Sequence, residues 1–249
     1  MSAHALHAGP GPRHDDPAEA VDVDRRQGPY GEVALRRRGE TYEIIANGCF
    51  LMDTSDGRSE RLLVDAAYDA LCARPAGSPP PSVLIGGLGV GFSLAHAAAQ
   101  DRWGPVTVVE REEAIIDWHR EGPLSAVSGP ALADPRVTIL HADLVAHLRT
   151  PADERADAGP ARYDALCLDI DNGPDWTVTD DNRNLYTPAG LAACRTRLNP
   201  GGVLAVWSAQ PSTAFEEALR EAGFTDVRTE EIPVARGVPD AVHLARRPA

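Results

Sequence analysis

Two patterns of hydrophobic residues, one typical of buried strands and one typical of helices, alternate along most of this chain. Beyond residue 81, short apolar runs alternate with segments whose apolar residues recur at helical spacing. Such alternation predicts an α/β fold with a parallel sheet, and Thr225–Ile232 and Ala241–Arg246 can add an antiparallel pair at its edge. We therefore expect a Rossmann-like, mostly parallel sheet of seven strands, the first five being Val83–Ile85, Val106–Glu110, Val137–His141, Tyr163–Asp169 and Val203–Ser208.

The part before residue 81 has a different pattern. Residues 1–27 mix Ala, Gly, Pro, His and Asp without periodicity, which predicts a disordered tail. Three short strand-like segments follow, with Asn47-Gly48 as a strong hairpin turn, and then a segment at helical spacing. Residues 28–80 are thus expected to form a β-hairpin appendage with a connecting helix, composed of Glu32–Arg37, Thr41–Ala46, Cys49–Asp53 and Ser59–Ala73.

A glycine-rich turn ends the first apolar run of the main domain. Gly87, Gly89 and Gly91 allow the backbone to bend sharply and to approach a ligand that a side chain would exclude. A dinucleotide fingerprint needs its third glycine where this chain has Phe92. The G-x-G-x-G spacing is instead typical of folds that bind S-adenosylmethionine, in which an amino acid and a ribose pass over the turn. The turn therefore predicts a nucleotide-binding transferase domain over residues 81–249.

Acidic residues end or follow three of the predicted strands. Glu110 lies 19 residues after Gly91, a suitable distance for a carboxylate that accepts both ribose hydroxyls. Asp143 follows the third strand of the main domain, where two roles are open: it accepts the adenine amino group, or it caps the next helix. Asp169 ends the fourth strand and is expected to point at the reacting centre. Ligands in such sheets bind beyond the carboxyl ends of the strands, so these acids are site candidates.

Charge and residue usage exclude several kinds of function. All 24 basic residues are arginine, and without a lysine amine the chain cannot be a P-loop nucleotidase, a protein kinase, a pyridoxal phosphate enzyme or a Schiff-base aldolase. The formal net charge of −13 argues against a nucleic-acid partner. It would attract a cationic substrate such as an amine, although an acidic surface also serves solubility alone.

The cysteines and histidines give no sign of a metal site. No C-x-x-C or His-x-His pair occurs, so we expect no metal. The chain also lacks a signal-peptide core and an apolar run long enough to span a membrane, which predicts a cytoplasmic protein without a membrane partner.

Taken together, the motifs of residues 28–210 resemble the spermidine synthase (polyamine aminopropyltransferase) family of the class I S-adenosylmethionine-dependent transferases. Besides the appendage and the glycine turn, the matching pieces are Val109-Glu110, Asp134-Pro135-Arg136, Tyr163-Asp164 and Leu198-Asn199-Pro200-Gly201-Gly202. The resemblance implies Asp169 as the catalytic base for an attacking amine, and a homodimer formed through the appendage. It also implies S-adenosylmethionine or its decarboxylated form as co-substrate, bound by Gly87, Gly89, Gly91, Glu110 and Asp143.

The chain departs from the family pattern around the acceptor. Val90 stands where the family has an aspartate that contacts the amine-bearing part of the ligands. The loop after the fourth strand has Asn172 in place of the family's second acid, whereas Asp171 is new, and the tyrosine–histidine pair of the helix after the appendage is missing. The aromatic side chains of that loop either contact a cation through their faces or pack the loop on the sheet. Candidates for the acceptor wall are Asp171, Asp175, Trp176 and Tyr186.

Three functions are compatible with these motifs. The leading hypothesis is a spermidine synthase-like transferase that uses S-adenosylmethionine or decarboxylated S-adenosylmethionine to alkylate a small nucleophile, in the first place an amine. The second is a small-molecule S-adenosylmethionine-dependent methyltransferase, which Val90 favours. The third is a catalytically silent binding protein that kept the nucleotide fold, which the rewritten acceptor loop favours.

Overall fold

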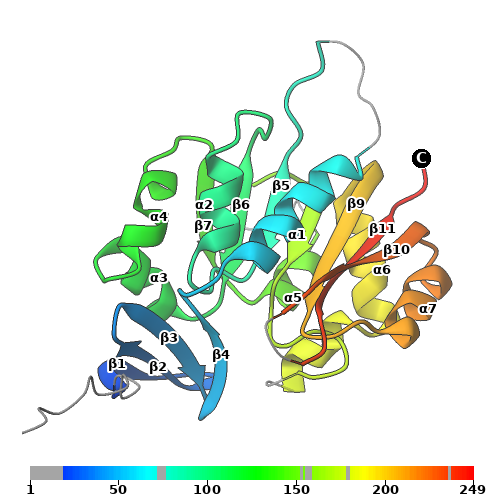
Figure 1. Cartoon of the computed structure of the whole chain (residues 1–249). Coiled ribbons are helices and arrows are strands. Elements are labelled where there is room, and N and C mark those ends of the chain that lie inside the picture. The colour runs from blue at the N-terminus through cyan, green and yellow to red at the C-terminus, as the bar shows by residue number, and fades with distance from the viewer. Residues whose placement is uncertain (1–18, 72–76, 152–153, 155–158, 178–179, 235–236) are drawn as a thin grey trace, which may run out of the picture.

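The computed structural model describes residues 19–71, 77–151, 154, 159–177, 180–234 and 237–249. These residues form an antiparallel N-terminal sheet and a larger mixed sheet with helices packed on it (Figure 1). The predicted α/β fold with a seven-stranded, mostly parallel sheet and an antiparallel edge is confirmed. None of the helices in the described part of the chain has the length and apolar character needed to cross a membrane.

The strand order of the main sheet creates a place for a ligand. The order is β10-β11-β9-β8-β5-β6-β7, with β10 and β11 antiparallel at one edge. From β5 the chain proceeds to β6 and β7 on one side and then returns to β8 and β9 on the other, so the order reverses between β5 and β8. Ligands bind beyond the carboxyl ends of the strands at such a reversal. The strands are β5 (Val83–Gly86), β6 (Val106–Glu110), β7 (Val137–His141), β8 (Tyr163–Leu168), β9 (Leu198–Ser208), β10 (Thr225–Ile232) and β11 (Asp240–Arg246).

Two groups of helices bury the two faces of this sheet. Helices α1 to α4 share one apolar cluster with the sheet, and α5 to α7 share the other. The sequence pattern does not predict α4, because its apolar residues do not keep to one face and it contains Pro130. The helices are α1 (Arg58–Asp69), α2 (Phe92–Ala98), α3 (Glu113–Arg120), α4 (Ser125–Leu132), α5 (Leu144–Arg149), α6 (Pro188–Arg197) and α7 (Thr213–Glu221), with a 3-10 helix η2 (Asp180–Leu185) before α6.

The N-terminal sheet is a meander in the order β1-β2-β3-β4. Asn47 and Gly48 have φ angles of 51° and 80° and form the predicted turn between β3 and β4. The first strand corrects the predicted tail, because residues 21–27 belong to β1 and pair with β2. The strands are β1 (Val21–Gly28), β2 (Gly31–Arg38), β3 (Thr41–Ala46) and β4 (Cys49–Asp53).

Strand β1 forms despite its polar sequence because its partners come from the tertiary structure. Trp118 of α3 donates a hydrogen bond from Nε1 to Asp24 at 2.8 Å, and Arg26 pairs with Asp117 at 2.7 Å. These contacts fasten the N-terminal sheet to α3 of the main domain. Residues 1–18, which make up the rest of the predicted tail, lie outside the described residues.

Candidate functional site

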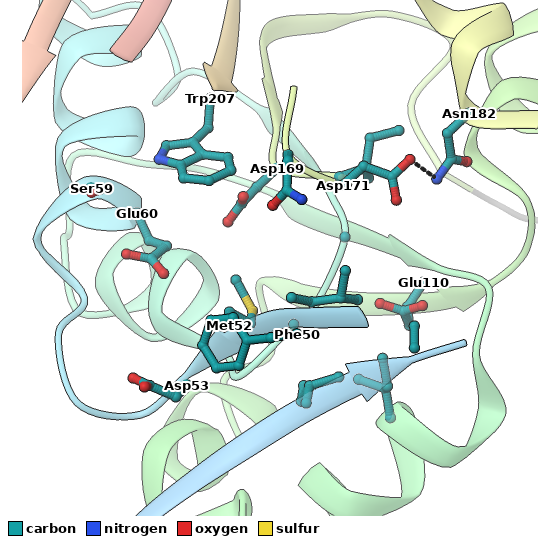
Figure 2. A pocket seen from close by; sticks show the side chains of 18 of the residues that line it. Phe50, Met52, Asp53, Ser59, Glu60, Glu110, Asp169, Asp171, Asn182 and Trp207 are labelled. Atoms are coloured by element: carbon teal, nitrogen blue, oxygen red, sulfur yellow. Dashed lines mark hydrogen bonds between the residues drawn. The ribbon is translucent and has the colours of Figure 1, made fainter. Parts of the chain in front are cut away.

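A cavity of about 490 Å³ opens at the carboxyl ends of β5, β6 and β8. Sites for small molecules have volumes of this order. Strand β4 and the first turn of α1 form the opposite wall, so the cavity lies between the two sheets (Figure 2). The predicted site residues that line it are Gly87, Gly89, Glu110, Asp143, Asp169, Asp171 and Trp176.

The glycine turn needs its first two glycines for steric reasons. Gly87 and Gly89 have φ angles of 92° and 50°, in the region that favours glycine. A Cβ atom on Gly87 would lie 2.3 Å from the carbonyl oxygen of Asp169, and one on Gly89 would lie 2.3 Å from Sδ of Met52. The turn is therefore closely packed between β8 and β4, and its backbone faces the cavity directly.

Gly91 was predicted to bind the co-substrate with the other two glycines, but it does not line the cavity and instead supports the turn. It is the N-cap of α2 with φ 96°, and a Cβ there would lie 2.7 Å from Cε1 of His119. Nε2 of the buried His119 ring donates to the Gly89 carbonyl at 2.9 Å, and Nδ1 lies 2.7 Å from the Ser128 hydroxyl. Burial lowers the pKa of His119, so the ring is neutral and Nδ1 accepts from Ser128.

Glu110 is held in a fixed orientation at the end of β6. One carboxylate oxygen accepts a hydrogen bond from the Leu88 amide at 2.9 Å, and the other accepts from the Glu112 amide at 2.8 Å. The side chain is only 7% exposed. Each oxygen keeps capacity for a further hydrogen bond, so the group is an oriented acceptor for two neighbouring hydroxyls.

Asp143 takes the capping role that the sequence left open. One of its oxygens accepts from the Ala146 amide at 2.8 Å, at the N-cap of α5. The residue also lines the cavity. Capping uses one carboxylate oxygen, so contact of the other with an adenine amino group stays a prediction.

Asp169 faces Glu60 of α1 across the other end of the cavity (Figure 2). Burial raises the pKa of Asp169 well above its ordinary value, and the charges of Glu60 and Asp240 raise it further. Burial also raises the pKa of Glu60 to about 7, with Asp240 and Asp56 adding to the shift. Burial and the neighbouring acids thus favour the protonated forms of these two carboxyl groups.

The loop after β8 brings only part of the predicted acceptor wall to the cavity. Asp171 lines it and accepts from the Asn182 amide at 2.8 Å. Trp176 lines it with 62% of its surface exposed. Asp175, which precedes Trp176 in the same loop, does not line the cavity. The loop turns sharply at Asp171 and Gly173, which have φ angles of 54° and 99°.

Tyr186 is also outside the cavity wall, and its packing role is the observed one. The ring lies edge-on to Phe215 with centroids 5.6 Å apart, and its hydroxyl donates to the Ile170 carbonyl at 3.4 Å. Burial raises the pKa of Tyr186. The Tyr186 ring, which the sequence analysis named as a candidate for the acceptor wall, thus packs in the apolar layer between α7 and the loop.

Several residues that line the cavity were missed by the sequence analysis. Glu60 carried a readable signal, since it is an acid on the same helical stripe as the buried Leu63, Val64 and Ala67. The others carry no local signal and meet only in the fold; Ser59, for example, donates to Asp240 at 2.6 Å across 181 positions of sequence. Further examples are Phe50 and Met52 of β4, Trp207 of β9 and Asp240 of β11.

Within the described residues, no group of three or more His, Cys, Asp or Glu side chains has an arrangement that could hold a metal ion.

In sequence, the chain is similar to a known transferase. It is 28% identical over 187 residues to a polyamine aminopropyltransferase from Corynebacterium efficiens, which covers 75% of this chain and 33% of the relative. The matched region thus spans about a third of the relative's length. No family model matches the chain.

In structure, the chain is similar to spermidine synthases. The enzyme from Thermotoga maritima gives a TM-score of 0.69 at 18% identity, covering 91% of this chain and 72% of that one. A spermidine synthase in complex with the transition-state analogue AdoDATO gives 0.70 at 17% identity, covering 91% and 73%. A probable spermidine synthase from Corynebacterium glutamicum gives 0.58 at 17% identity, covering 90% and 79%.

At these identities the structural likeness establishes the fold, and the sequence match points in the same direction. The resemblance indicated by the motifs is confirmed: the chain is similar in sequence to a polyamine aminopropyltransferase and has the fold of spermidine synthases.

Proposed function

We propose that the protein is a small-molecule alkyltransferase that moves a group from an adenosine sulfonium donor to an amine. The observation that carries the proposal is one cavity with two chemically different ends. At one end, the oriented Glu110 carboxylate beside the glycine turn suits the two hydroxyls of a ribose. At the other end, Glu60 and Asp169 suit a cationic nitrogen.

The names of the relatives support an aminopropyl group as the one transferred and an amine as the acceptor. One relative is a polyamine aminopropyltransferase, and the structural neighbours are spermidine synthases. Homodimer formation through the N-terminal sheet and a cytoplasmic location belong to the same proposal; sedimentation velocity measures the first, and cell fractionation measures the second.

The charge of the cavity favours the decarboxylated donor. Carboxyl side chains far outnumber the two arginines that line the cavity, Arg58 and Arg111. Arg58 pairs with Asp56 at 2.7 Å, and Arg111 pairs with Glu112 at 3.4 Å. The carboxylate of S-adenosylmethionine would lie near the acidic end and be repelled there, whereas the decarboxylated donor ends in an amine.

The transfer reaction mainly requires that the nucleophile be aligned with the donor carbon. A sulfonium activates the adjacent carbon for in-line displacement, and the protein has to hold the nucleophilic nitrogen about 3 to 3.5 Å from that carbon. Asp169 ends β8 next to the glycine turn, as its carbonyl contact with Gly87 indicates. Its carboxylate is therefore in position to hold an amine in line with a donor that lies over the turn.

Isothermal titration with decarboxylated S-adenosylmethionine, S-adenosylmethionine and methylthioadenosine tests the donor. We expect the decarboxylated donor to bind about tenfold or more tightly than S-adenosylmethionine, since removing one like charge is worth on the order of 1 kcal/mol or more. If the folded protein binds none of the three, the proposal fails. If it binds a donor but forms no product with any amine, the catalytically silent hypothesis is supported.

A small-molecule methyltransferase is the second candidate, and the surroundings of Val90 favour it. Val90 is buried and does not line the cavity, and its amide donates to Sδ of Met52 at 3.2 Å, so this position presents no carboxylate to a ligand. An aminopropyl chain would find no carboxylate at Val90 for its ammonium group. Intact-mass analysis of the products decides between the two candidates, because a methyl and an aminopropyl group add different masses.

A further inference from the structure

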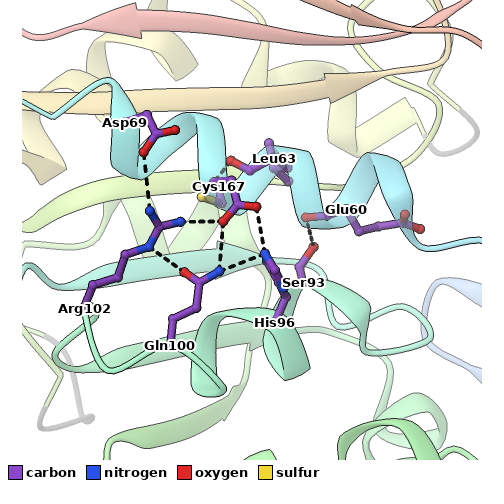
Figure 3. Close-up of polar contacts among 9 residues, drawn as sticks. Glu60, Leu63, Asp69, Ser93, His96, Gln100, Arg102 and Cys167 are labelled. Carbon is purple, nitrogen blue, oxygen red and sulfur yellow. Dashed lines mark hydrogen bonds and ion pairs between the residues drawn. The ribbon is translucent and has the colours of Figure 1, made fainter.

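Glu60 differs from the other acids of α1 in its contacts (Figure 3). Asp65 accepts hydrogen bonds from Gln100 at 2.8 Å and pairs with His96 at 2.9 Å and with Arg102. Asp69 pairs with Arg102 at 3.4 Å. Glu60 lies outside this network: its carbonyl oxygen accepts from the Ser93 hydroxyl at 3.4 Å, and its carboxylate takes no part.

The carboxylate of Glu60 is buried and directed into the cavity. The residue is 9% exposed, and its carboxylate lies on the cavity wall opposite Asp169 (Figure 2). Its own main-chain amide is the hydrogen-bond donor that acts on it. No side chain among the described residues donates a hydrogen bond to this carboxylate or forms an ion pair with it. A buried carboxylate in such surroundings is stable only when protonated or when a cation is bound.

The groups around Glu60 explain its proton affinity. Three acids face it: Asp169 at the end of β8, Asp240 at the start of β11 and Asp56 just before α1. Arg61 of its own helix lowers the shift a little and lies over the Phe92 ring of α2 at 5.5 Å, while Arg58 pairs with Asp56. The neighbouring elements otherwise contribute the Ser93 hydroxyl from α2 and the uncharged Trp207 from β9.

We propose that Glu60 is a second acid–base residue of the transfer reaction, which faces Asp169 across the cavity and accepts the proton that the acceptor's ammonium group loses. The inference rests on the proposed function and deepens it. Two carboxylates divide the work that one could not do at once: Asp169 holds the nitrogen in line, and Glu60 removes its proton. A base with a pKa near 7 is well matched to this task at neutral pH.

The step balances in atoms and charge. The ammonium group of the acceptor gives one proton to the Glu60 carboxylate, which leaves a neutral amine with a free lone pair. The lone pair forms a bond to the carbon next to the sulfonium, and the carbon–sulfur bond breaks with its electron pair staying on sulfur as a neutral thioether. The positive charge moves to the new alkylammonium nitrogen, and Glu60 later releases its proton to solvent.

The test compares the parent with Glu60→Gln, using decarboxylated S-adenosylmethionine and 1,4-diaminobutane as substrates. Asp69→Asn is the matched control, since this acid lies at the far end of α1 with 70% of its side chain exposed. We expect Glu60→Gln to lower kcat/KM about 100-fold at pH 7, as general-base removal typically does, and to abolish the ionisation near pH 7 in the pH profile. Glu60→Asp should restore part of the activity with that ionisation present, and the affinity for methylthioadenosine should stay within about twofold in all variants.

Two kinetic results would overturn the inference. One is a Glu60→Gln enzyme with the parent's pH profile, and the other is a loss of methylthioadenosine affinity that parallels the loss of activity, since that pattern indicates a structural role. If the parent binds methylthioadenosine but alkylates no amine, the proposed function fails separately. The ligand-free protein then decides: identical pH dependence of the unfolding free energy in the parent and in Glu60→Gln also overturns the role of Glu60 as a proton carrier.

Discussion

At the scale of single residues, main-chain groups orient the side chain that we propose to hold the donor. The Glu110 carboxylate bridges the Leu88 amide in the glycine turn and the Glu112 amide at the start of α3. Since both bonds exist without a ligand, binding does not have to order this side chain. A ligand group that meets an already oriented acceptor loses less conformational entropy on binding.

Replacing Glu110 with Gln should weaken donor binding. The amide NH2 group would face one of the two main-chain N–H donors, and the charge that strengthens hydrogen bonds to ribose hydroxyls would be lost. We expect methylthioadenosine to bind about 10 to 100 times more weakly, which corresponds to one charge-assisted hydrogen bond. Isothermal titration measures this, with the exposed Glu113→Gln as control; equal affinity in Glu110→Gln would contradict the assigned role.

Single residues also show what the sequence could reveal about the site. Glu110, Asp143 and Asp169 were predicted because each follows an apolar run that is readable as a strand, and all three line the cavity. Asp240 was not, because its place opposite Asp169 depends on how the last two strands return across the sheet. Hydrophobic periodicity therefore predicts where strands end, but it does not predict which residues from distant parts of the chain lie beside those ends.

At the scale of elements, α3 and α4 stabilise the glycine turn through a single buried ring. His119 of α3 links the Gly89 carbonyl to the Ser128 hydroxyl of α4. The turn carries left-handed backbone at Gly87, Gly89 and Gly91, so its conformation depends on such outside contacts. A helix that was absent from the sequence prediction thus contributes to the geometry of the glycine turn.

Two variants of His119 should separate this role from simple packing. His119→Gln keeps a donor near the position of Nε2 and should retain the bond to Gly89, whereas His119→Asn places its amide near Nδ1 and loses that bond. We expect Asn to be less stable than Gln by about 1 kcal/mol, and to bind methylthioadenosine several-fold more weakly. Denaturant unfolding and titration measure both quantities; equal behaviour of the two variants would contradict the role of His119 as a support of the turn.

The pH dependence of stability gives a second readout for His119. Its pKa is lowered from 6.5 by burial, so below pH 6.5 the unfolded chain takes up a proton that the folded protein does not. The free energy of unfolding therefore falls as pH drops below 6.5, and this component should be missing in His119→Gln. Glu60 contributes with the opposite sign, because its pKa of about 7 lets the folded protein keep a proton that the unfolded chain loses between pH 4.5 and 7. Difference curves between parent and variant separate the two.

At the scale of the whole molecule, the net charge of −13 and the acids of the cavity act in the same direction. They attract a cationic acceptor and have little effect on an uncharged nucleoside. We expect KM for 1,4-diaminobutane to rise several-fold from low salt to ~0.5 M ionic strength, where screening is strong. The affinity for methylthioadenosine should stay constant over the same range, and a salt-independent KM would argue against a cationic acceptor.

The overall architecture was predictable because each parallel strand is a continuous apolar run, and polar or glycine- and proline-containing loops separate these runs. The strands Thr41–Ala46 and Val106–Glu110 have the predicted bounds. Strand β1 was not predictable, since its stability comes from Trp118 and Asp117, which contact it from the main domain. Local pattern thus gives the elements that bury their own apolar face, and misses those that depend on a partner.

The contact between Met52 and Gly89 means that the boundary between the two sheets runs through the middle of the binding cavity. Glu110 and Asp143 come from one side of this boundary, and Phe50 and Met52 come from the other. Exchanging residues 19–57 for the corresponding segment of a relative would therefore change both the cavity wall at Phe50 and Met52 and the packing against the glycine turn. The small sheet is thus a structural part of the cavity, and a change in it reaches the glycine turn through Met52.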